Sequence, residues 1–438
     1  MTDPAATRVA VLAELAWRGL VAESTDLTAL GPVLGASPVT LYCGFDPTAP
    51  SLHLGNLVQI LTLRRFQLAG HRPLALVGGA TGLIGDPKPS GDRQLNDEAV
   101  VAGWVERIRA QIEPYLAFDG PNAALMVNNL DWTAGLSTIA FLRDIGRHFR
   151  VGRMLAKEVV SARLASESGI SFTEFSYQLL QGMDFLELYR RHGCLLQTGG
   201  SDQWGNLTAG VDLVRRAEGA QVHALATPLI TKADGTKFGK TETGTIWLDP
   251  ELTSPYAFFQ FWLGTDDRDA DRYLKVFSFR DRAEIDELAA ATAERPQERA
   301  AQRALAVELT ALVHGPQAVE QVQAASAALF GGGELGRLEA ATLSAALAEA
   351  PSVAVGADVP PFVELLATAL GISRSDARRA VQDGGAYLNN VKVSDLGYVP
   401  EPGDWLHGRF LVLRRGKRSV AVAERATQGG SVTVRPPV

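Results

Sequence analysis

Cysteine is scarce in this chain, with only Cys43 and Cys194 among 438 residues. So few cysteines exclude a disulfide-stapled secreted scaffold. No group of Cys and His has the spacing of zinc ligands, so we expect no protein-bound metal. Each cysteine adjoins a predicted strand, which indicates reduced thiols and predicts a cytoplasmic protein.

Long apolar runs and a targeting segment are missing as well. No apolar run is long enough to span a bilayer, so we expect no membrane association. The first four residues, Met-Thr-Asp-Pro, lack the basic and apolar regions of a signal peptide. The composition, 46% hydrophobic and 21% charged, is that of a globular protein. A chain of 438 residues is too long for one ordinary core, so we expect two or three domains.

The net charge of −7 is unevenly distributed. From residue 361 to the end, 11 Lys and Arg stand against 7 Asp and Glu, a balance of +4. The remainder carries 31 against 42, a balance of −11. The basic C-terminal part is therefore the region expected to contact nucleic acid, with a chance fluctuation of surface charge as the alternative.

The most informative pattern is a strand, a turn and a helix within residues 39–69. Residues 39–43 are β-branched, apolar and aromatic, which predicts a buried strand that ends at Gly44. The helical pattern runs from Gly55 toward Gly70. A strand that enters a helix through a tight turn aims free N–H groups and the helix dipole at the turn, which favours an anion there. His53 adds a donor. A plain strand–turn–helix with a satisfied histidine is the alternative.

A second phosphate-type loop follows almost two hundred residues later, at residues 237–241. Between the two loops, strand and helix patterns alternate from about residue 39 to 247, which favours an α/β fold with a doubly wound parallel sheet. Ligands of such sheets bind beyond the carboxyl ends of the strands, where both loops are expected.

The rest of the chain divides into three segments. We expect an α/β domain over 1–250, an all-α domain over 251–350, a linker over 351–361 and a small α+β domain over 362–438. The linker is inferred from its Ala, Pro and Gly content. In the last segment, a basic helix is expected from Ser373, and Asn389-Asn390 between short apolar runs predicts a hairpin.

A polar stripe lies on the helix predicted near residues 173–189. Tyr177, Gln181 and Asp184 are spaced i, i+4 and i+7, so they share one helical face. A stripe of this kind on an otherwise apolar helix suggests a small polar ligand. A solvated surface face is the alternative.

Together these motifs resemble class I aminoacyl-tRNA synthetases. Residues 53–56, His-Leu-Gly-Asn, resemble that class's His-Ile-Gly-His motif, and residues 237–241, Lys-Phe-Gly-Lys-Thr, resemble its Lys-Met-Ser-Lys-Ser loop. Within the class, residues 42–47, 78–87 and 199–206 are similar to bacterial tyrosyl-tRNA synthetases. The resemblance covers essentially the whole chain. Asn56 in place of the second histidine, and Gly239 and Thr241 in place of two serines, are departures from it.

The resemblance implies a fold, a reaction and partners. The fold would be a Rossmann-like catalytic domain, an α-helical anticodon-binding domain and an S-four-like RNA-binding domain. The reaction would join L-tyrosine to ATP as tyrosyl-adenylate, with release of pyrophosphate, and then transfer tyrosine to the 3′ end of tRNA(Tyr). Mg²⁺ would arrive with ATP, and the protein would be a homodimer.

The resemblance also assigns residues. The catalytic set is Thr48, His53, Asn56, Lys237, Lys240 and Thr241. The tyrosine-binding set is Tyr42, Asp86, Tyr177, Gln181 and Asp184. The ATP-binding set is Cys43, Asp46, Gly55, Gly200, Asp202, Gln203 and Lys240. The RNA-binding set expected in the basic tail is Arg374, Arg378, Arg379 and Lys392.

Within these sets, Tyr42 and Asp184 would bind the phenolic hydroxyl of the substrate. Tyr177, Gln181 and Asp86 would hold its ammonium group, since oxygen acceptors complement a cation. A packed, inert thiol is the alternative for Cys43.

Other functions are weighed against this one. The tryptophan enzyme shares the fold, but an indole has no hydroxyl for Tyr42 and Asp184. Another nucleotidyltransferase is disfavoured by the second lysine loop and the basic tail. A synthetase-like RNA-binding protein without catalysis is disfavoured by the presence of both lysines and the pocket residues, although Asn56 leaves room for it.

Overall fold

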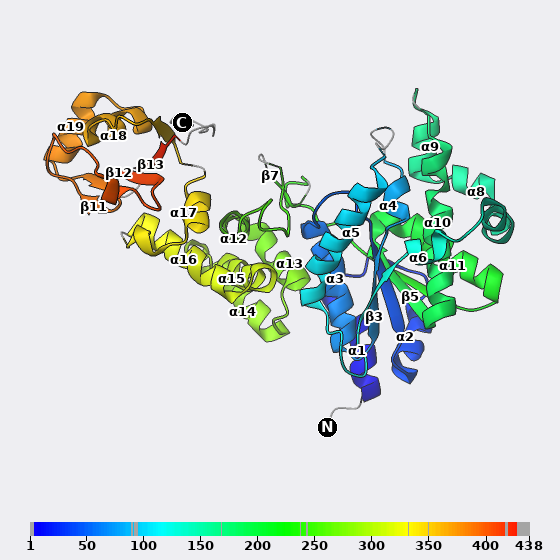
Figure 1. Ribbon diagram of the computed structural model, residues 1–438. Coiled ribbons are helices and arrows are strands. Elements are labelled where there is room, and N and C mark those ends of the chain that lie inside the picture. Colours follow the sequence, from blue (N-terminus) through cyan, green and yellow to red (C-terminus); the bar gives the residue numbers. More distant parts are fainter. Residues whose placement is uncertain are drawn as a thin grey trace. The chain divides into compact units, whose positions relative to one another are not determined.

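The computed structural model describes residues 4–88, 91, 95–167, 169–236, 238–241, 244–331, 333–348, 350–416 and 419–426. The chain forms two compact units (Figure 1). The first unit contains the residues up to Leu252 together with Thr265–Ala301. The second contains Thr253–Gly264 and the residues from Gln302 onward.

The first unit is built on a six-stranded sheet with the order β1-β6-β5-β2-β3-β4. Its strands are β1 (Glu23–Ser24), β2 (Thr40–Phe45), β3 (Arg72–Val77), β4 (Leu125–Asn128), β5 (Cys194–Gly200) and β6 (His223–Thr227). All neighbours pair in parallel except β1, which is antiparallel to β6. The chain builds outward from β2 in both directions, so a topological switch point falls between β2 and β5. The predicted doubly wound parallel sheet is confirmed.

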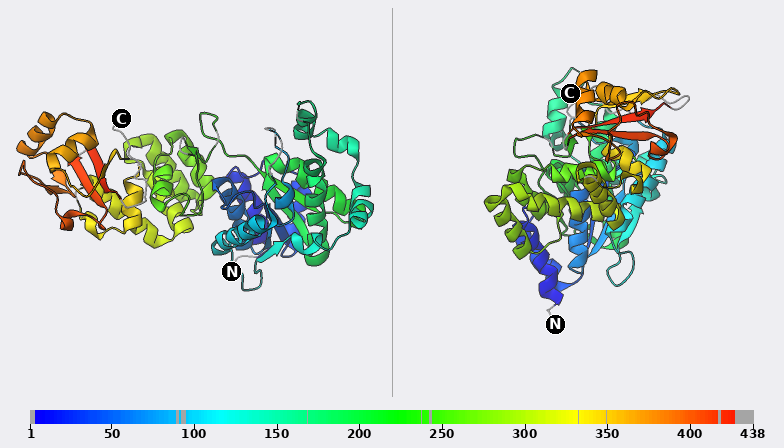
Figure 2. Two further views of the ribbon diagram at one scale, coloured as in Figure 1. Left: turned by 45° about the horizontal axis from the view of Figure 1, so that its top comes forward. Right: turned by 90° about the vertical axis from the view of Figure 1, so that its left-hand side faces the viewer.

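Helices cover both faces of this sheet (Figures 1 and 2). The longer ones are α1 (Pro4–Trp17), α2 (Leu27–Ala36), α3 (Leu54–Leu68), α5 (Glu98–Ile112), α10 (Phe172–His192), α11 (Trp204–Glu218), α13 (Asp267–Phe277) and α14 (Arg282–Glu294). The short ones are α4 (Thr81–Ile84), η1 (Glu113–Tyr115), α6 (Leu130–Thr133), α7 (Thr138–Ala140), η2 (Phe141–Ile145), η3 (Gly146–His148), α8 (Val151–Leu155), α9 (Glu158–Leu164), η4 (Ser201–Gln203) and η5 (Pro296–Glu298). A two-stranded ribbon, β7 (Lys240–Thr241) and β8 (Gly244–Thr245), completes the unit.

Local sequence explains where these elements begin and end. Strand β2 continues through Gly44, which we expected to end it, because the whole strand pairs with β3 as far as Phe45. Helix α3 ends at Leu68, and Gly70 beyond it has φ +96°. Helix α10 ends at His192, and the next residue, Gly193, has a φ of +60°, the left-handed conformation that suits a helix stop.

The second unit combines helices with a five-stranded sheet of order β11-β10-β12-β13-β9. The helices are α12 (Pro255–Leu263), α15 (Ala300–His314), α16 (Pro316–Gly331), η6 (Leu335–Arg337), α17 (Ala340–Ala346), α18 (Phe362–Leu370), α19 (Arg374–Gln382) and η7 (Pro402–Asp404). The strands are β9 (Ser352–Val355), β10 (Ala386–Leu388), β11 (Val391–Lys392), β12 (Phe410–Arg415) and β13 (Ser419–Arg425). Helix α18 packs on this sheet and buries Phe362 and Leu366 in a shared core.

The predicted hairpin and basic helix are both confirmed. Tyr387 pairs with Lys392 across the turn at Asn389 and Asn390. The two asparagines have φ values of +48° and +68°, as a tight I′-type turn requires. The Ser373 hydroxyl accepts from the Asp376 N–H and caps α19, where the sequence placed the helix start.

Two segments differ from the domain organisation that the sequence predicted. The expected linker over 351–361 contains β9, which pairs in parallel with β13 from Ser352 to Val355. Helices α13 and α14, inside the expected all-α domain, belong to the compact first unit. Both differences come from contacts between residues distant in sequence, which local composition does not reveal.

Each helix among the described residues is too short or too polar to cross a membrane.

Candidate active site

The candidate site gathers at the carboxyl ends of the central parallel strands. The turn after β3 and the residues after β4 meet there, where the Ala80 N–H donates to Asn129 Oδ1 at 2.7 Å. Gly78 and Gly79 leave the room that this meeting needs. A Cβ atom on Gly78 would lie 2.0 Å from Asp46 Oδ1, and one on Gly79 would lie 2.4 Å from Asn128 Oδ1.

Tyr42 and Asp184 form the innermost part of the site. Both side chains are buried, Tyr42 at 1% and Asp184 at 2% exposure. The Asp184 carboxylate accepts from Asn129 Nδ2 at 3.0 Å and from Trp132 Nε1 at 2.9 Å. The Tyr42 hydroxyl has no hydrogen-bond partner among the described residues, although it is buried. A buried hydroxyl without a partner, beside a fixed carboxylate, fits a ligand that brings its own polar group.

Two buried amide oxygens extend this pattern. Gln197 lies opposite Tyr42 on the neighbouring strand β5, and Gln181 lies on α10. Oε1 of each is buried and has no partner within the described part of the chain. Buried acceptors without a partner, one beside Tyr42 and one on the polar face of α10, are typical of a binding site rather than of a finished core.

Burial sets the charge state of the inner pocket. It raises the pKa of the Asp184 carboxyl to about 7, against the opposing hydrogen bonds from Asn129 and Trp132. Burial and the neighbouring Asp184 charge also raise the pKa of Tyr42 well above its usual value, so that phenol stays protonated.

Acidic side chains surround the hydroxyl of Tyr177. This hydroxyl donates to Asp46 Oδ2 at 2.6 Å, and the Thr81 hydroxyl donates to Asp46 Oδ1 at 2.6 Å. Burial, followed by the charges of Asp46, Asp86 and Asp184, raises the pKa of Tyr177. The polar face of α10 therefore turns inward, toward the carboxylates of Asp46 and Asp86. Together with Asp184 they suit a small cation.

Asp86 is held by a network of amides. Its two oxygens accept from Gln203 Nε2 at 3.0 Å and from Asn206 Nδ2 at 3.2 Å. Lys157 Nζ donates to Asn206 Oδ1 at 2.9 Å, at the far end of this network. Burial lowers the pKa of the Lys157 ammonium to about 8, while the charge of Asp86 opposes that shift.

His53 and Asn56 build the turn at the start of α3. The Gly55 N–H donates to His53 Nδ1 at 3.0 Å, so a neutral ring carries its proton on Nε2. The His53 N–H donates to Asn56 Oδ1 at 3.1 Å, which completes a capping box. Asn56 thus has a structural task in this turn, beside the ATP-side role that the resemblance implies.

The lysine loop adjoins this turn through backbone hydrogen bonds. The Leu54 N–H donates to the Ile246 carbonyl at 3.4 Å, and the Ile246 N–H donates to the Gly239 carbonyl at 2.9 Å. The ring of Trp247 lies 6.2 Å from that of His53. Lys237 lies outside the described residues, while the backbone of Lys240 and Thr241 forms β7. The structure therefore brings the two predicted phosphate loops together.

The remaining predicted ATP residues occupy different settings. Thr48 is exposed at the turn after β2, where its N–H donates to the Asp46 carbonyl at 2.9 Å. Gly200 ends β5, and a Cβ there would lie 2.5 Å from Asp202 Oδ1. Cys43 is buried, and burial raises the pKa of its thiol to about 12. That setting matches the packed, inert thiol weighed as its alternative.

The predicted RNA-binding residues lie on the surface of the second unit. Arg378 and Arg379 are exposed on α19, and Lys392 is exposed on β11. Arg374 forms an ion pair with Glu364, and Arg379 lies 3.9 Å from Asp376. Helix and hairpin thus present basic groups to solvent.

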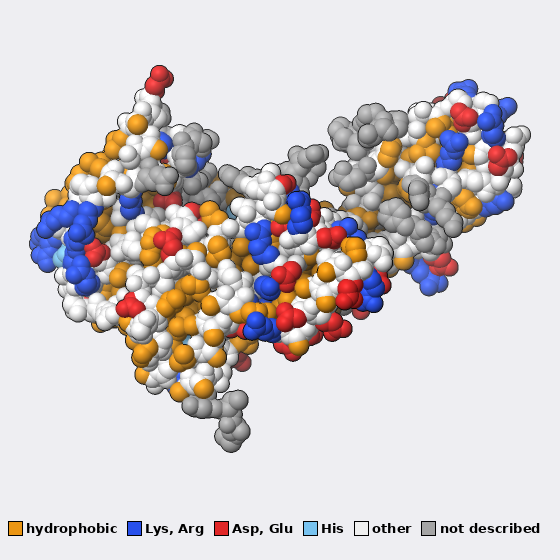
Figure 3. Space-filling view, turned by 180° about the vertical axis from the view of Figure 1, so that it is seen from behind, with side chains coloured by type: hydrophobic (Ala, Val, Ile, Leu, Met, Phe, Trp, Pro, Cys, Tyr) orange, Lys and Arg blue, Asp and Glu red, His pale blue; other side chains and the backbone are white. Residues whose placement is uncertain are grey.

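A second basic surface, which the sequence did not indicate, lies on the first unit. Figure 3 shows Lys and Arg side chains gathered beside a histidine on this unit. Arg147, Arg216, Arg150 and Arg190 lie around His148 and, after burial, lower the pKa of its ring. These arginines come from η3, from the residue before α8, and from α10 and α11, so only the fold brings them together.

Comparison with known proteins identifies the class. A family model described as tRNA synthetases class I (W and Y) matches residues 35–331. A second, described as the Tyrosine--tRNA ligase SYY-like C-terminal domain, matches residues 342–423. The chain belongs to the class I tRNA synthetases of the tryptophan and tyrosine group.

Relatives carry the more particular name. A protein of Streptomyces avermitilis named tyrosine–tRNA ligase is 68% identical over 416 residues, which cover 94% of this chain and 98% of that protein. Another of that name, from Acidothermus cellulolyticus, is 62% identical and covers 95% and 99%. A C-terminally truncated mitochondrial tyrosyl-tRNA synthetase of Coccidioides posadasii superposes with a TM-score of 0.64 at 32% identity, over 71% of this chain and 90% of that one.

Proposed function

We propose that this protein is a tyrosine–tRNA ligase. It uses ATP to convert L-tyrosine into tyrosyl-adenylate and pyrophosphate, and then transfers tyrosine to the 3′ end of tRNA(Tyr). The single observation that carries the choice of amino acid is the unpartnered hydroxyl of Tyr42 beside the fixed carboxylate of Asp184.

That pair selects a phenol over its competitors. A phenylalanine ring would leave Tyr42 and Asp184 without the partner that their buried polar atoms need, and an indole has no hydroxyl at that end. Rejection of phenylalanine by tyrosyl-tRNA synthetases is the standard illustration of this effect. The tryptophan enzyme, which shares the family, is therefore the disfavoured reading.

The opposite end of the pocket receives the ammonium group. Asp46, Asp86 and Asp184 all act on Tyr177 through their charges, so this region is strongly electronegative. Gln181 Oε1 is a buried acceptor without a partner among the described residues, and it adds a further site for an ammonium N–H. Tyrosine would thus lie between a hydroxyl-binding end and an ammonium-binding end.

Catalysis of the first step needs positioning and charge stabilisation more than proton transfer. The attacking carboxylate is already an anion, so no general base is required. Thr48, His53 and Asn56 at the first turn, and Lys237, Lys240 and Thr241 in the second loop, would neutralise charge on the phosphates. Gly55, Gly200, Asp202 and Gln203 would line the nucleotide. Mg²⁺ would enter bound to ATP rather than in a protein cage.

Amino-acid-dependent exchange between ATP and labelled pyrophosphate tests the proposal. We expect exchange with tyrosine, and none above background with tryptophan or phenylalanine at matched concentrations. Exchange with tryptophan would instead identify the protein as the tryptophan enzyme of the same family. Absence of exchange with every amino acid, in a protein that still binds tRNA, would favour an RNA-binding protein without catalysis.

For the RNA partner, we propose two basic surfaces. Arg374, Arg378, Arg379 and Lys392 on the second unit would contact phosphates of folded RNA, where shape and backbone contacts dominate recognition. The arginines around His148 offer a second phosphate-binding surface on the catalytic unit. Replacing Arg378 and Arg379 with Ala should weaken tRNA binding and leave tyrosine-dependent exchange intact.

We also propose a homodimer formed through the exposed apolar side chains within residues 139–172 and not through the arginines around His148. Large apolar side chains are exposed there, with Ile139 at 71%, Val151 at 60% and Phe172 at 74%. Several large apolar side chains exposed within one segment are typical of an interface. Phe172→Glu should halve the mass measured by light scattering. Leu68→Glu, at another apolar position that is 66% exposed, should leave the mass unchanged.

The cytoplasm is the proposed location. Both cysteines are free and buried, as expected for a protein that folds in a reducing compartment.

A further inference from the structure

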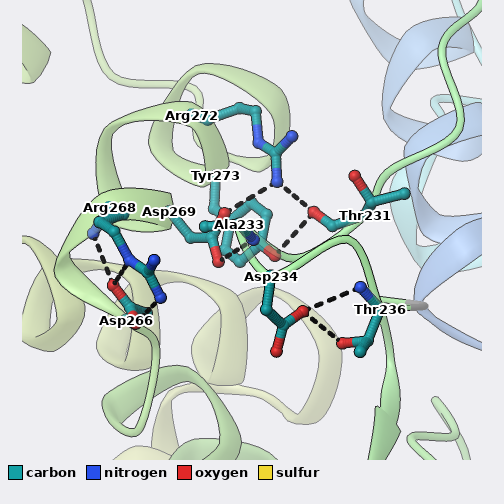
Figure 4. Close-up of polar contacts among 9 residues, drawn as sticks. All are labelled: Thr231, Ala233, Asp234, Thr236, Asp266, Arg268, Asp269, Arg272 and Tyr273. Atoms are coloured by element: carbon teal, nitrogen blue, oxygen red, sulfur yellow. Dashed lines mark hydrogen bonds and ion pairs between the residues drawn. The ribbon is translucent and has the colours of Figure 1, made fainter.

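Helix α13 carries a polar cluster that faces the entrance of the lysine loop (Figure 4). The cluster consists of Asp269, Arg272 and Tyr273, and none of them belongs to the predicted site. Asp269 is only 3% exposed, which is unusual for a carboxylate away from a binding pocket.

Asp269 joins the loop backbone to the helix. Its Oδ2 accepts from the Ala233 N–H at 2.9 Å, and its Oδ1 accepts from Arg272 Nη2 at 2.8 Å. The same guanidinium also donates to the Thr231 carbonyl. The Tyr273 hydroxyl donates to that carbonyl as well, at 3.2 Å. Two consecutive turns of α13 thus hold Thr231 and Ala233.

The loop then folds back in a tight turn that needs no help from α13. The Lys232 N–H donates to the Thr236 carbonyl at 2.9 Å. Asp234 Oδ1 accepts from the Thr236 N–H at 2.8 Å and from its hydroxyl at 2.6 Å, and Gly235 has φ +81°. Because this turn is tight, the position of Thr231 and Ala233 also sets the position of the loop residues that follow the turn.

A second attachment lies just past Lys237. The ring of Phe238 packs 4.7 Å from that of Tyr273 and 5.3 Å from that of Phe277, both on α13. The Gly239 carbonyl then accepts from the Ile246 N–H, and Ile246 accepts from Leu54 at the first phosphate turn. Helix α13 therefore fixes the loop on both sides of Lys237, and the loop is registered against the turn that holds His53.

We propose that Asp269 is a positioning residue for adenylate formation. Through its bonds to Ala233 and Arg272, it sets where the loop presents its two lysines to the phosphates of ATP. This inference rests on the proposed ligase function. Asp269 lies outside the pocket and outside both signature motifs. Its role would mean that α13 contributes to catalysis by positioning the lysine loop.

The test compares Asp269→Asn with Asp266→Asn, a matched control on the same helix. Asp266 caps α13 and pairs with Arg268 at 2.8 Å, and asparagine is an equally good cap. Asp269→Asn should lower the rate of adenylate formation by ~10- to 100-fold, the range expected when reacting groups shift by about 1 Å. The Kd for tyrosine should stay within about twofold of the wild type, since the pocket is untouched. Asp266→Asn should match the wild type in both measurements.

A double-mutant cycle separates positioning from general damage to the fold. If Asp269 acts through the lysines, Asp269→Asn should add little to the defect of Lys240→Ala, since coupled residues are not additive. Tyr273→Phe removes the hydroxyl that donates to the Thr231 carbonyl and keeps the ring contact with Phe238, so it should cost less than Asp269→Asn. Full additivity, or a parallel loss of tyrosine binding, would overturn the inference.

Failure of the broader proposal has a different signature. A wild-type protein without tyrosine-dependent exchange would remove the ligase function itself. An active wild type with an equally active Asp269→Asn variant would remove only the role of Asp269. Thermal unfolding of each variant, followed by circular dichroism, checks that the compared proteins are folded.

Discussion

The tyrosine pocket and the phosphate side of the site are built in contrasting ways. The pocket takes its groups from the interiors of regular elements, such as Tyr42 in β2 and Asp184 in α10, and both are buried. The phosphate side consists of turns, with His53 exposed at a helix start and the lysine loop joined to it by backbone bonds.

This contrast teaches where specificity and rate reside. Buried groups that lack a partner reject a wrong ligand, because they stay unsatisfied when it binds. Turn residues near solvent reject little, but they can meet charge that develops on phosphates. Substitutions in the tyrosine pocket should therefore weaken the binding of tyrosine. Substitutions on the phosphate side should instead slow adenylate formation.

Lys240→Ala should give the largest effect and test the rate side. Loss of one charged donor to the phosphates should slow adenylate formation by ~10²- to 10³-fold. The Kd for tyrosine should not change, because the pocket lies in other elements. Single-turnover kinetics with equilibrium dialysis measure both quantities. Lys275→Ala, which breaks an ordinary surface pair with Asp271, is the control. Loss of tyrosine binding in Lys240→Ala would contradict the division.

Asp184→Asn tests the pocket through pH. The folded protein keeps the Asp184 proton up to a pKa of about 7, whereas the unfolded chain releases it near the usual value of 3.8. Between these values the folded state binds more protons, so stability falls as pH rises, by about 1.4 kcal/mol per pH unit. Urea unfolding without ligand at pH 5.5 and 7.5 should show this loss in the wild type. The variant should lack this contribution. If the free energy of unfolding changed equally with pH in the wild type and in Asp184→Asn, the carboxylate would not lie in a buried pocket.

The sequence predicted the two halves of the site unequally. The phosphate side lies in contiguous motifs, so residues 53–56 and 237–241 were found directly, and the parallel sheet explained why they meet. The pocket depends on contacts between distant segments. Asn129 and Trp132, which hold Asp184, were missed. Their only signal was a position just beyond the end of a short apolar strand, Leu125–Asn128.

Two further features have the same physical origin. Asp46 stays a predicted ATP residue, and its hydrogen bonds from Tyr177 and Thr81, which link three separate elements, were not predicted. Helix α13 was assigned to the all-α domain by its neighbours in sequence, yet its side chains hold the lysine loop. Periodicity identifies a helix and its faces, but it does not say what the helix packs against.

Tyr42→Phe should give a smaller and more selective effect. Tyr42 hydroxyl has no partner among the described residues, so its removal should leave the free energy of unfolding almost unchanged. Tyrosine binding should weaken by ~0.5–1.5 kcal/mol, the usual worth of one neutral hydrogen bond, or about 2- to 13-fold. Discrimination against phenylalanine should narrow by a similar factor in pyrophosphate exchange. A large loss of stability would instead make this hydroxyl part of the core.

Asn56 caps the first phosphate turn, at the start of a regular helix. Its variants should give the smallest effects. Asn56→Ala removes the acceptor of the His53 N–H and should cost ~1 kcal/mol of stability, as the loss of a capping interaction does. Asn56→Asp keeps that acceptor and adds a negative charge at a helix start, which the helix dipole favours.

If Asn56 serves only the turn, Asn56→Asp should match the wild type in urea unfolding and in the KM for ATP. If Asn56 also faces the phosphates, the aspartate should repel them and raise the KM for ATP several-fold, with tyrosine binding unchanged. We expect the second result, because the capping box holds Asn56 within one helical turn of His53 at the anion-favouring end of α3. An unchanged KM would assign Asn56 to structure alone and leave His53 to act on ATP without it.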